Sequence, residues 1–174
     1  ESMAKIGLIS LGCAKNLVDS EHMLSLLRRA GHTIVEDMDE AEVGIVNTCG
    51  FIEAAKTEAI ETILETASHK QTGPMRGLVV TGCLAQRYPD EIRDELPEVD
   101  AICGTGSYES ITDAVEAALG GKKAAYMADM AAAALDEAVA RFTYYHGDTH
   151  IDAPAGAIWP MNTLIMALAI PFAA

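Results

Sequence analysis

Three of the four cysteines stand where an apolar run of the sequence ends beside a glycine. Cys13 follows the run in "LISLG", Cys49 the run in "VGIVNT", and Cys83 the run in "GLVVTG". The intervals between them have the length of a strand followed by a helix, and not of a short local metal-binding motif. Three soft thiolates brought together would suit an iron–sulfur cluster or zinc. Because tetrahedral structural zinc needs a fourth ligand that the neighbouring sequence does not offer, we favour a cluster over zinc and over unrelated buried thiols.

The elements that would position these cysteines alternate between strand and helix patterns. Near-continuous apolar runs indicate buried strands, and they cover Lys5–Leu11, Thr33–Val35, Val43–Val46, Leu78–Val80 and Ala101–Ile102. Helical spacing of apolar residues fills the gaps, beginning with a stripe of Leu17, Met23, Leu24 and Leu27. A short helix is expected to start around Pro89 and to stop at Pro97.

This alternation predicts an α/β fold, a flavodoxin-like doubly wound parallel sheet of about five strands in the order 2-1-3-4-5. In that order the cysteine-bearing strands, the first, third and fourth, are neighbours. Neighbouring strands lie about 4.8 Å apart, so the three thiols should open on one crevice at the carboxyl ends of the strands. We expect one domain over residues 4–121. Residues 124–174 differ in composition and form an unassigned tail without cysteine.

Cys103 ends the fifth predicted strand, one strand farther out than the other cysteines. A cysteine is commonly a small buried hydrophobic residue, so we interpret Cys103 as core and not as a fourth ligand. The same loops exclude other flavodoxin-like functions. A low-molecular-weight phosphatase needs an arginine after Cys13, where the sequence has only Lys15, and a receiver domain needs acidic residues where Cys13 and Cys49 stand. Thioredoxin chemistry needs a C-x-x-C motif, which the sequence lacks.

The charge of the chain restricts its partners. With 12 Lys and Arg against 26 Asp and Glu, the formal net charge is −14. A nucleic-acid-binding surface needs clustered cations to neutralise phosphates, so this chain is not expected to bind nucleic acid directly. We find no secretory signal before the first strand, and the apolar run of residues 164–174 is far shorter than the roughly 20 residues of a membrane helix. We therefore expect a cytoplasmic protein without membrane contact, whose cysteines act as ligands in a reducing compartment.

The tail contains one further set of possible metal ligands. If its segment "HGDTHID" were extended, His146, Asp148 and His150 would share one strand face. The glycine and the turn-forming Asp-Thr pair within it instead favour a loop that carries ordinary polar residues.

The motifs around the three cysteines resemble a known family. The segments "SLGCAKNLVDSE", "IVNTCGFIEAAKTEAIETI" and "VVTGCLAQRYPDEI" are similar to the three cysteine motifs of the amino-terminal domain of methylthiotransferases. The likeness covers residues 4 to 121, with the motifs in order and at the expected intervals. Within the family, "GCAKNLVDSE" and "NTCGFI" most resemble the enzyme that methylthiolates an aspartate of a small-subunit ribosomal protein. The tRNA-modifying branch typically has "GCQMN" at the first motif.

The resemblance implies that Cys13, Cys49 and Cys83 bind an auxiliary 4Fe–4S cluster whose open iron holds the sulfur to be inserted. Asn16 and Asn47 match motif positions beside the thiolates, where their amides should cap helix or loop backbone. A second 4Fe–4S cluster and S-adenosylmethionine belong to a radical barrel with a C-x3-C-x2-C motif, which this sequence lacks.

We therefore expect the full-length parent to be the methylthiotransferase and this chain alone to be inactive, and we assign no catalytic residue. The alternatives are the tRNA-modifying sibling and a non-catalytic docking module that binds zinc or a cluster.

Overall fold

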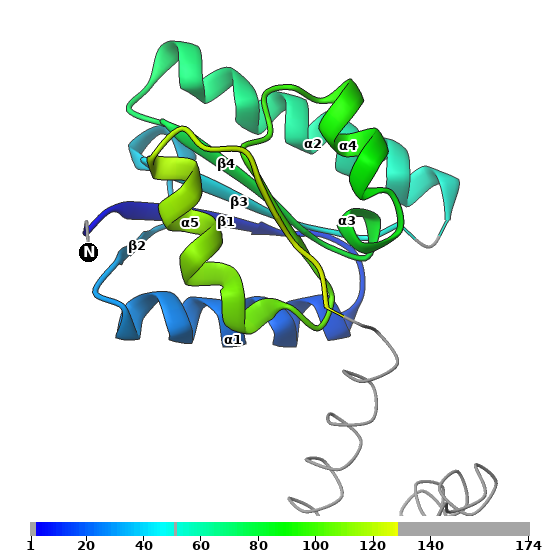
Figure 1. The fold of residues 1–174 in the computed structure, drawn as a ribbon, viewed down its shortest axis with the longest axis horizontal. Helices are drawn as coiled ribbons and strands as arrows, with labels where there is room; N and C mark the ends of the chain where they lie inside the picture. Colours follow the sequence, from blue (N-terminus) through cyan, green and yellow to red (C-terminus); the bar gives the residue numbers. More distant parts are fainter. Residues whose placement is uncertain (1–2, 51, 129–174) are drawn as a thin grey trace, which may run out of the picture. The chain divides into compact units, whose positions relative to one another are not determined.

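The computed structural model describes residues 3–50 and 52–128, in which strands and helices alternate along the chain (Figure 1). Their order is β1 (Lys5–Ser10), α1 (Ala14–Arg29), β2 (Thr33–Val35), the 3-10 helix η1 (Met38–Glu40), β3 (Val43–Thr48), α2 (Glu53–Thr72), β4 (Gly77–Gly82), α3 (Cys83–Arg87), α4 (Pro89–Glu95), β5 (Ala101–Gly104), the 3-10 helix η2 (Tyr108–Ser110), α5 (Ile111–Leu119) and β6 (Ala124–Tyr126).

The strands form one parallel sheet in the order β2-β1-β3-β4-β5-β6. The predicted α/β fold and the order of the first five strands are therefore confirmed. The sequence analysis missed β6, in which Ala124 lies opposite Ala101 of β5. Two alanines and a tyrosine carry no strand pattern of their own, so only the pairing with β5 makes this segment a strand. The strand order reverses between β1 and β3, which is where ligands bind in doubly wound sheets.

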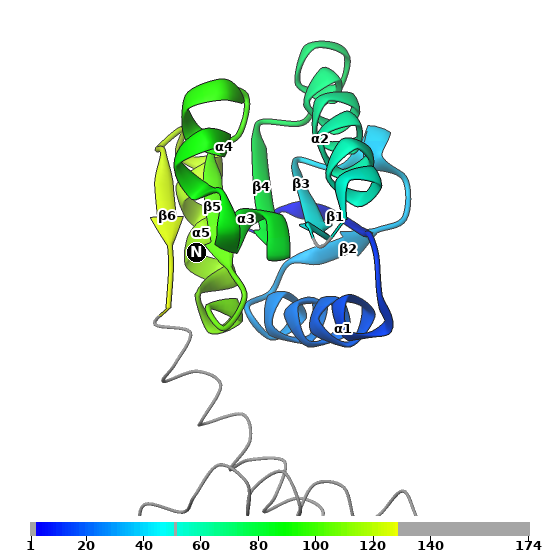
Figure 2. The same ribbon diagram turned by 90° about the vertical axis from the view of Figure 1, so that its right-hand side faces the viewer.

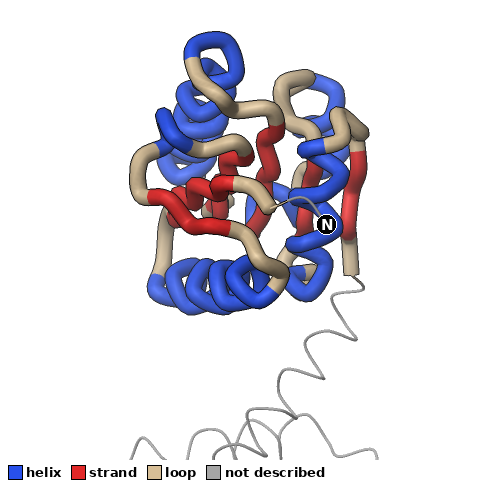
Figure 3. The backbone as a smooth tube through the Cα atoms, turned by 90° about the vertical axis from the view of Figure 1, so that its left-hand side faces the viewer, coloured by secondary structure: helices blue, strands red, loops and turns tan. Residues whose placement is uncertain are grey.

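Helices cover both faces of the sheet, with α1 and α5 on one face and α2, α3 and α4 on the other (Figures 1 and 2). Figure 3 shows the same layers with the helices in blue on either side of the red strands. Successive residues of β3 face opposite layers: Ile45 belongs to the core under α1 and α5, and Val46 to the core under α2. Because β3 and β4 are buried on both faces, they read as continuous apolar runs.

The burial of α1 differs from the predicted apolar stripe at one position. Met23 and Leu27 are fully buried, but Leu17 is 55% exposed. The inward positions of the first turns hold Asn16 and Ser20 instead, both of which are buried. These polar side chains bond to the strand ends, so Leu17, one position around the helix, faces solvent. The prediction failed because it assumed that an inward face is apolar throughout.

The structure confirms one further prediction and leaves another outside the described residues. The short helix α4 has Pro89 at its start and ends at Glu95, before Pro97, as expected. The proposed metal ligands His146, Asp148 and His150 lie outside the described residues. Among the described residues, no helix is both long and apolar enough to cross a membrane.

Candidate metal centre

Three cysteines follow the carboxyl ends of adjacent strands, and we call Cys13, Cys49 and Cys83 the thiol edge. Thr48 of β3 pairs with Gly82 of β4, and the next residue of each strand is a cysteine. Cys49 and Cys83 therefore leave the sheet side by side. Ser10 of β1 pairs with Asn47, so Cys13 lies one residue farther out along the neighbouring loop. The strand order confirms the prediction that the cysteine-bearing strands are neighbours.

Two glycines let the loops of the thiol edge approach each other. Gly12 has φ +91°, and a Cβ there would lie only 2.5 Å from the Cβ of Cys49. Gly82 has φ +94°, and a Cβ there would collide with the carbonyl oxygen of Thr48. Side-chain-bearing residues rarely adopt such backbone angles. The glycines beside Cys13 and Cys83 are thus required both by the turn and by the closeness of the second loop.

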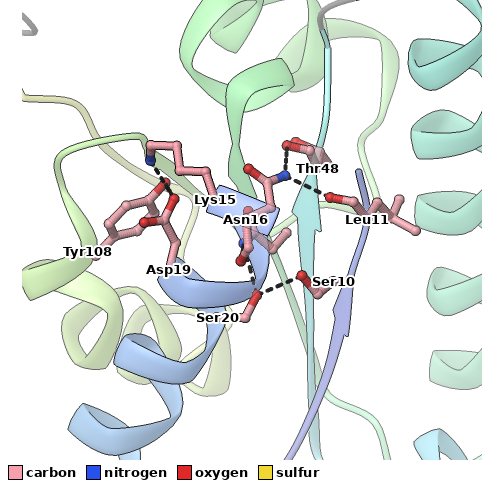
Figure 4. Close-up of polar contacts among 9 residues, drawn as sticks. Ser10, Leu11, Lys15, Asn16, Asp19, Ser20, Thr48 and Tyr108 are labelled. Carbon is pink, nitrogen blue, oxygen red and sulfur yellow. Dashed lines mark hydrogen bonds and ion pairs between the residues drawn. The ribbon is translucent and has the colours of Figure 1, made fainter. Parts of the chain in front are cut away.

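A network of buried amides and hydroxyls fastens α1 to the strand ends (Figure 4). The Nδ2 of Asn16 donates to the carbonyl oxygens of Leu11 (2.7 Å) and Thr48 (3.0 Å), which precede the first and second cysteine loops. The Nδ2 of Asn47 donates to the carbonyl oxygen of Asn16 and to the Oγ of Ser20, both at 2.9 Å. Ser20 in turn donates to Ser10. Both asparagines therefore bind backbone beside the thiols, as the sequence predicted.

The environments of the three thiols differ. Cys13 is exposed and is the N-cap residue of α1, and the backbone amides of Asn16 and Lys15 in the first turn lower the pKa of its thiol. Cys83 is half-buried, and its burial, followed by the negative charge of Cys49, raises the pKa of its thiol. Cys49 is also half-buried. Cys49 acts on the pKa of Cys83 because the two cysteines lie at the same edge of the sheet, and a negative charge on one thiol disfavours ionisation of the other.

A charged group lies next to the thiol edge and was missed by the sequence analysis. The Nζ of Lys15 is 2.5 Å from the Oδ2 of Asp19, and the hydroxyl of Tyr108 donates to the same oxygen at 2.9 Å (Figure 4). The Lys15 ammonium also lies 5.5 Å from the centre of the Tyr108 ring. The i,i+4 spacing of Lys15 and Asp19 indicates an ion pair in a helix, but nothing in the sequence links either residue to Tyr108.

Cys103 is separate from the thiol edge. It lies in β5 opposite Thr81, two residues before Cys83 on the neighbouring strand, and its side chain is fully buried. Its Sγ donates to the carbonyl oxygen of Ser107 at 3.1 Å, and burial raises the pKa of its thiol to about 12. These contacts agree with the prediction that Cys103 belongs to the core.

The described residues offer sulfur ligands but no preformed site for a single metal ion. Within residues 3–50 and 52–128, no three or more His, Cys, Asp or Glu side chains are arranged to hold a metal ion. The thiolates around a four-iron cube bind different irons, and so stand farther apart than the ligands of one ion. Cys13, Cys49 and Cys83 supply three free thiols on one edge, and thiolates are ligands of both iron–sulfur clusters and zinc.

Comparison with known proteins gives one matching family model and many relatives. The model describes the uncharacterized protein family UPF0004 and matches residues 5–104. Ribosomal protein uS12 methylthiotransferase RimO of Lachnoclostridium phytofermentans is 56% identical over 119 residues, which are 68% of this chain and 27% of that protein. The proteins of the same name from Clostridioides difficile and Symbiobacterium thermophilum are 58% identical over 109 residues (63% of this chain, 24% of that protein) and 50% identical over 125 residues (72% and 26%).

The matches confirm the resemblance to methylthiotransferases that the cysteine motifs predicted. The matching region of the chain spans about a quarter of the length of these relatives.

Proposed function

This chain belongs to the uncharacterized protein family UPF0004, and we propose that it is the domain of a methylthiotransferase that binds an auxiliary 4Fe–4S cluster. The similarity to RimO proteins, which carry the name of ribosomal protein uS12 methylthiotransferases, supports this assignment. We further propose that the parent protein methylthiolates an aspartate of that small-subunit ribosomal protein, and therefore acts in the cytoplasm.

One observation carries the proposal: three free thiols follow the carboxyl ends of adjacent strands next to the point where the strand order reverses. A buried structural role would not need these positions, since Cys103 shows how this fold buries a thiol inside a strand. The close approach of Gly12 to Cys49 brings the first two loops together without any metal. This approach supports a shared role for the thiols of the first two loops.

The residues of the chain would hold the cluster and set its surroundings. When bound, the cluster would supply an open iron that carries the sulfur to be transferred. Cys13 is best placed to bind as a thiolate, because the amides of the first turn of α1 stabilise its negative charge. Asn16 and Asn47 would keep α1 and the loops in register while metal binds and leaves.

The remaining parts of the reaction would come from the rest of the parent protein. A second 4Fe–4S cluster and S-adenosylmethionine would supply the radical that activates the substrate, and the sequence has no C-x3-C-x2-C motif to hold them. We therefore expect this chain to bind its cluster but not to turn over.

Anaerobic reconstitution with iron and sulfide tests the proposal. We expect about four irons per chain, with one iron site distinct in the Mössbauer spectrum because it lacks a protein thiolate. Cys13→Ala, Cys49→Ala and Cys83→Ala should each lose the cluster. Cys103→Ala is the matched control and should keep it.

Three other results would change the assignment. Retention of a single zinc ion that does not depend on Cys83 would favour the docking module. Retention of four irons in all three edge variants would place the cluster elsewhere. With the full-length parent, modification of tRNA and not of the ribosomal protein would assign the chain to the tRNA-modifying branch.

A further inference from the structure

An ion pair that the three cysteines do not explain lies beside the thiol edge: the ammonium of Lys15 contacts the carboxylate of Asp19, which also accepts a hydrogen bond from Tyr108. We propose that Lys15, held by Asp19 and Tyr108, makes the thiol edge selective for small inorganic anions. This selectivity does not depend on the proposed function, since it follows from the arrangement of these three side chains.

The position of Lys15 is fixed from two sides. Its ammonium contacts the Oδ2 of Asp19 at 2.5 Å and lies 5.5 Å from the centre of the Tyr108 ring. Tyr108 belongs to η2, which follows β5, whereas Lys15 and Asp19 belong to α1, which follows β1 on the same face of the sheet. The contact therefore joins the helix that follows Cys13 to the segment that follows β5 (Figure 4). A lysine on a solvated helix face would have no such anchor.

The positively charged member of the ion pair, Lys15, is more exposed to solvent than the negatively charged member, Asp19. The side chain of Lys15 is 45% exposed, while that of Asp19 is only 13% exposed. The hydroxyl of Tyr108 donates to the same carboxylate oxygen, so that two donors share the negative charge of Asp19. An ion that approaches along the thiol edge consequently meets the ammonium first.

The charge of Lys15 affects the pKa values of Cys13 and Cys83. Lys15 is among the groups that lower the pKa of Cys13, and its charge opposes the increase in the pKa of Cys83 that burial and Cys49 cause. Its effect on Cys83 is larger than the opposite effect of Asp19. Lys15 therefore favours the charged form of both thiols, in a chain whose formal net charge is −14. Without Lys15 the overall charge would repel an anion.

A second lysine provides a matched comparison. Lys56 lies in the first turn of α2, pairs with Glu53 at 2.6 Å and is 5.0 Å from the centre of the Tyr88 ring. It thus repeats the carboxylate and ring contacts of Lys15. The groups that act most on Cys13 and Cys83 include Lys15 but not Lys56.

Competing alkylation of the 174-residue chain tests the selectivity without any metal. The rates of modification of Cys13 and Cys83 are measured separately with iodoacetate, an anion, and with iodoacetamide, which is neutral. Mass spectrometry of the peptides gives the rate at each cysteine. The ratio of the two rates cancels the ionised fraction and the accessibility of the thiol, which both reagents share, and leaves the effect of the local charge.

We expect Lys15→Gln to lower the ratio of iodoacetate to iodoacetamide rates at Cys83 about two- to fivefold, as loss of a unit charge a few ångströms away requires in water-like surroundings. Lys15→Arg should keep the ratio. Tyr108→Phe, which removes only the hydroxyl that holds Asp19, should lower it by less than Lys15→Gln. Raising the salt to 1 M should bring wild type toward the Lys15→Gln value.

The proposal is overturned if Lys15→Gln leaves the ratio unchanged, or if Lys56→Gln lowers it equally. Unchanged unfolding curves for both variants confirm that folding is not the cause. The reconstitution experiment gives an independent result. If the chain binds four irons but Lys15→Gln leaves the alkylation ratio unchanged, only the role of Lys15 is refuted. If Lys15→Gln lowers the ratio but no cluster forms, only the proposed function is refuted.

Discussion

The two ends of the sheet use polar residues in opposite ways. At the amino ends of β4 and β5, the carboxylate of Asp100 is 10% exposed and accepts hydrogen bonds from the ammonium groups of Lys70 and Lys123 and from the backbone amide of Leu78. At the carboxyl ends, the side-chain oxygens of Asn16 and Asn47 are buried without a hydrogen-bond partner among the described residues, and three thiols are free.

This difference indicates which end is built for stability and which for binding. Buried polar groups that have partners hold a fold in one arrangement, whereas unpartnered groups raise its energy. The amino end joins α2, β4, β5 and the start of β6 through Asp100. The carboxyl end keeps unpaired oxygens and free thiols, which agrees with the ligand site proposed there.

The largest expected effect is at the amino end. Asp100→Ala should lower the free energy of unfolding by about 2–4 kcal/mol, somewhat less than the loss of one partner of a fully buried ion pair, because Lys123 is half-exposed and can return to water. Urea denaturation measures this loss. Asp39→Ala is the control, since its carboxylate is 75% exposed beside His69 and its loss should cost under about 1 kcal/mol.

The same Asp100→Ala variant should leave the alkylation rates of Cys13 and Cys49 in the folded protein unchanged. A change in those rates would contradict the separation of the two ends, because it would show that the amino end also positions the thiols.

A smaller loss is expected at the carboxyl end from Gly12→Ala. The substituted residue would have an unfavourable φ of +91° and a Cβ pressed against Cys49, so we expect the free energy of unfolding to fall by about 1–3 kcal/mol. Iron uptake on reconstitution should also fall, because the first two loops must separate.

Gly121→Ala is the matched control for this change. Gly121 also has a positive φ, +65°, but a Cβ there meets no atom within 4 Å. We expect a loss of about 1 kcal/mol from the backbone angle and normal iron uptake. Equal iron uptake by the two variants would show that the approach of Gly12 to Cys49 is not needed for cluster binding.

The last prediction concerns pH and the buried thiol. Burial raises the pKa of Cys103 to about 12 from an ordinary value of 9.0. The unfolded chain therefore loses this proton first as pH rises, so the contribution of Cys103 to stability is complete below pH 9 and declines between pH 9 and 12. The decline amounts to at most about 1.4 kcal/mol per pH unit.

Cys103→Ala should reduce the alkaline slope of the unfolding free energy without moving the thiol edge. The measurement is urea denaturation from pH 8 to 11, with Cys49→Ala for comparison. An unchanged slope in Cys103→Ala would mean that groups other than this thiol, such as Tyr108, whose pKa burial and Asp19 also raise, govern alkaline stability.

The sequence by itself determined the sheet order, the burial of Cys103 and the shared edge of the three cysteine strands. These follow from local patterns, because a doubly buried strand must be continuously apolar and a strand–helix alternation must wind in one hand. Asn16 and Asn47 were also found, since amides beside a turn have few roles other than binding backbone.

Only the tertiary structure decided the position of Leu17, the strand β6 and the contact of Lys15 and Asp19 with Tyr108. Leu17 faces solvent because the inward positions of α1 are taken by Asn16 and Ser20, which bond to strand ends. β6 is a strand only because β5 offers it an edge. Tyr108 is 89 residues from Asp19 along the chain. Contacts between distant segments depend on how helices pack across the sheet, and no local pattern of residues records that geometry.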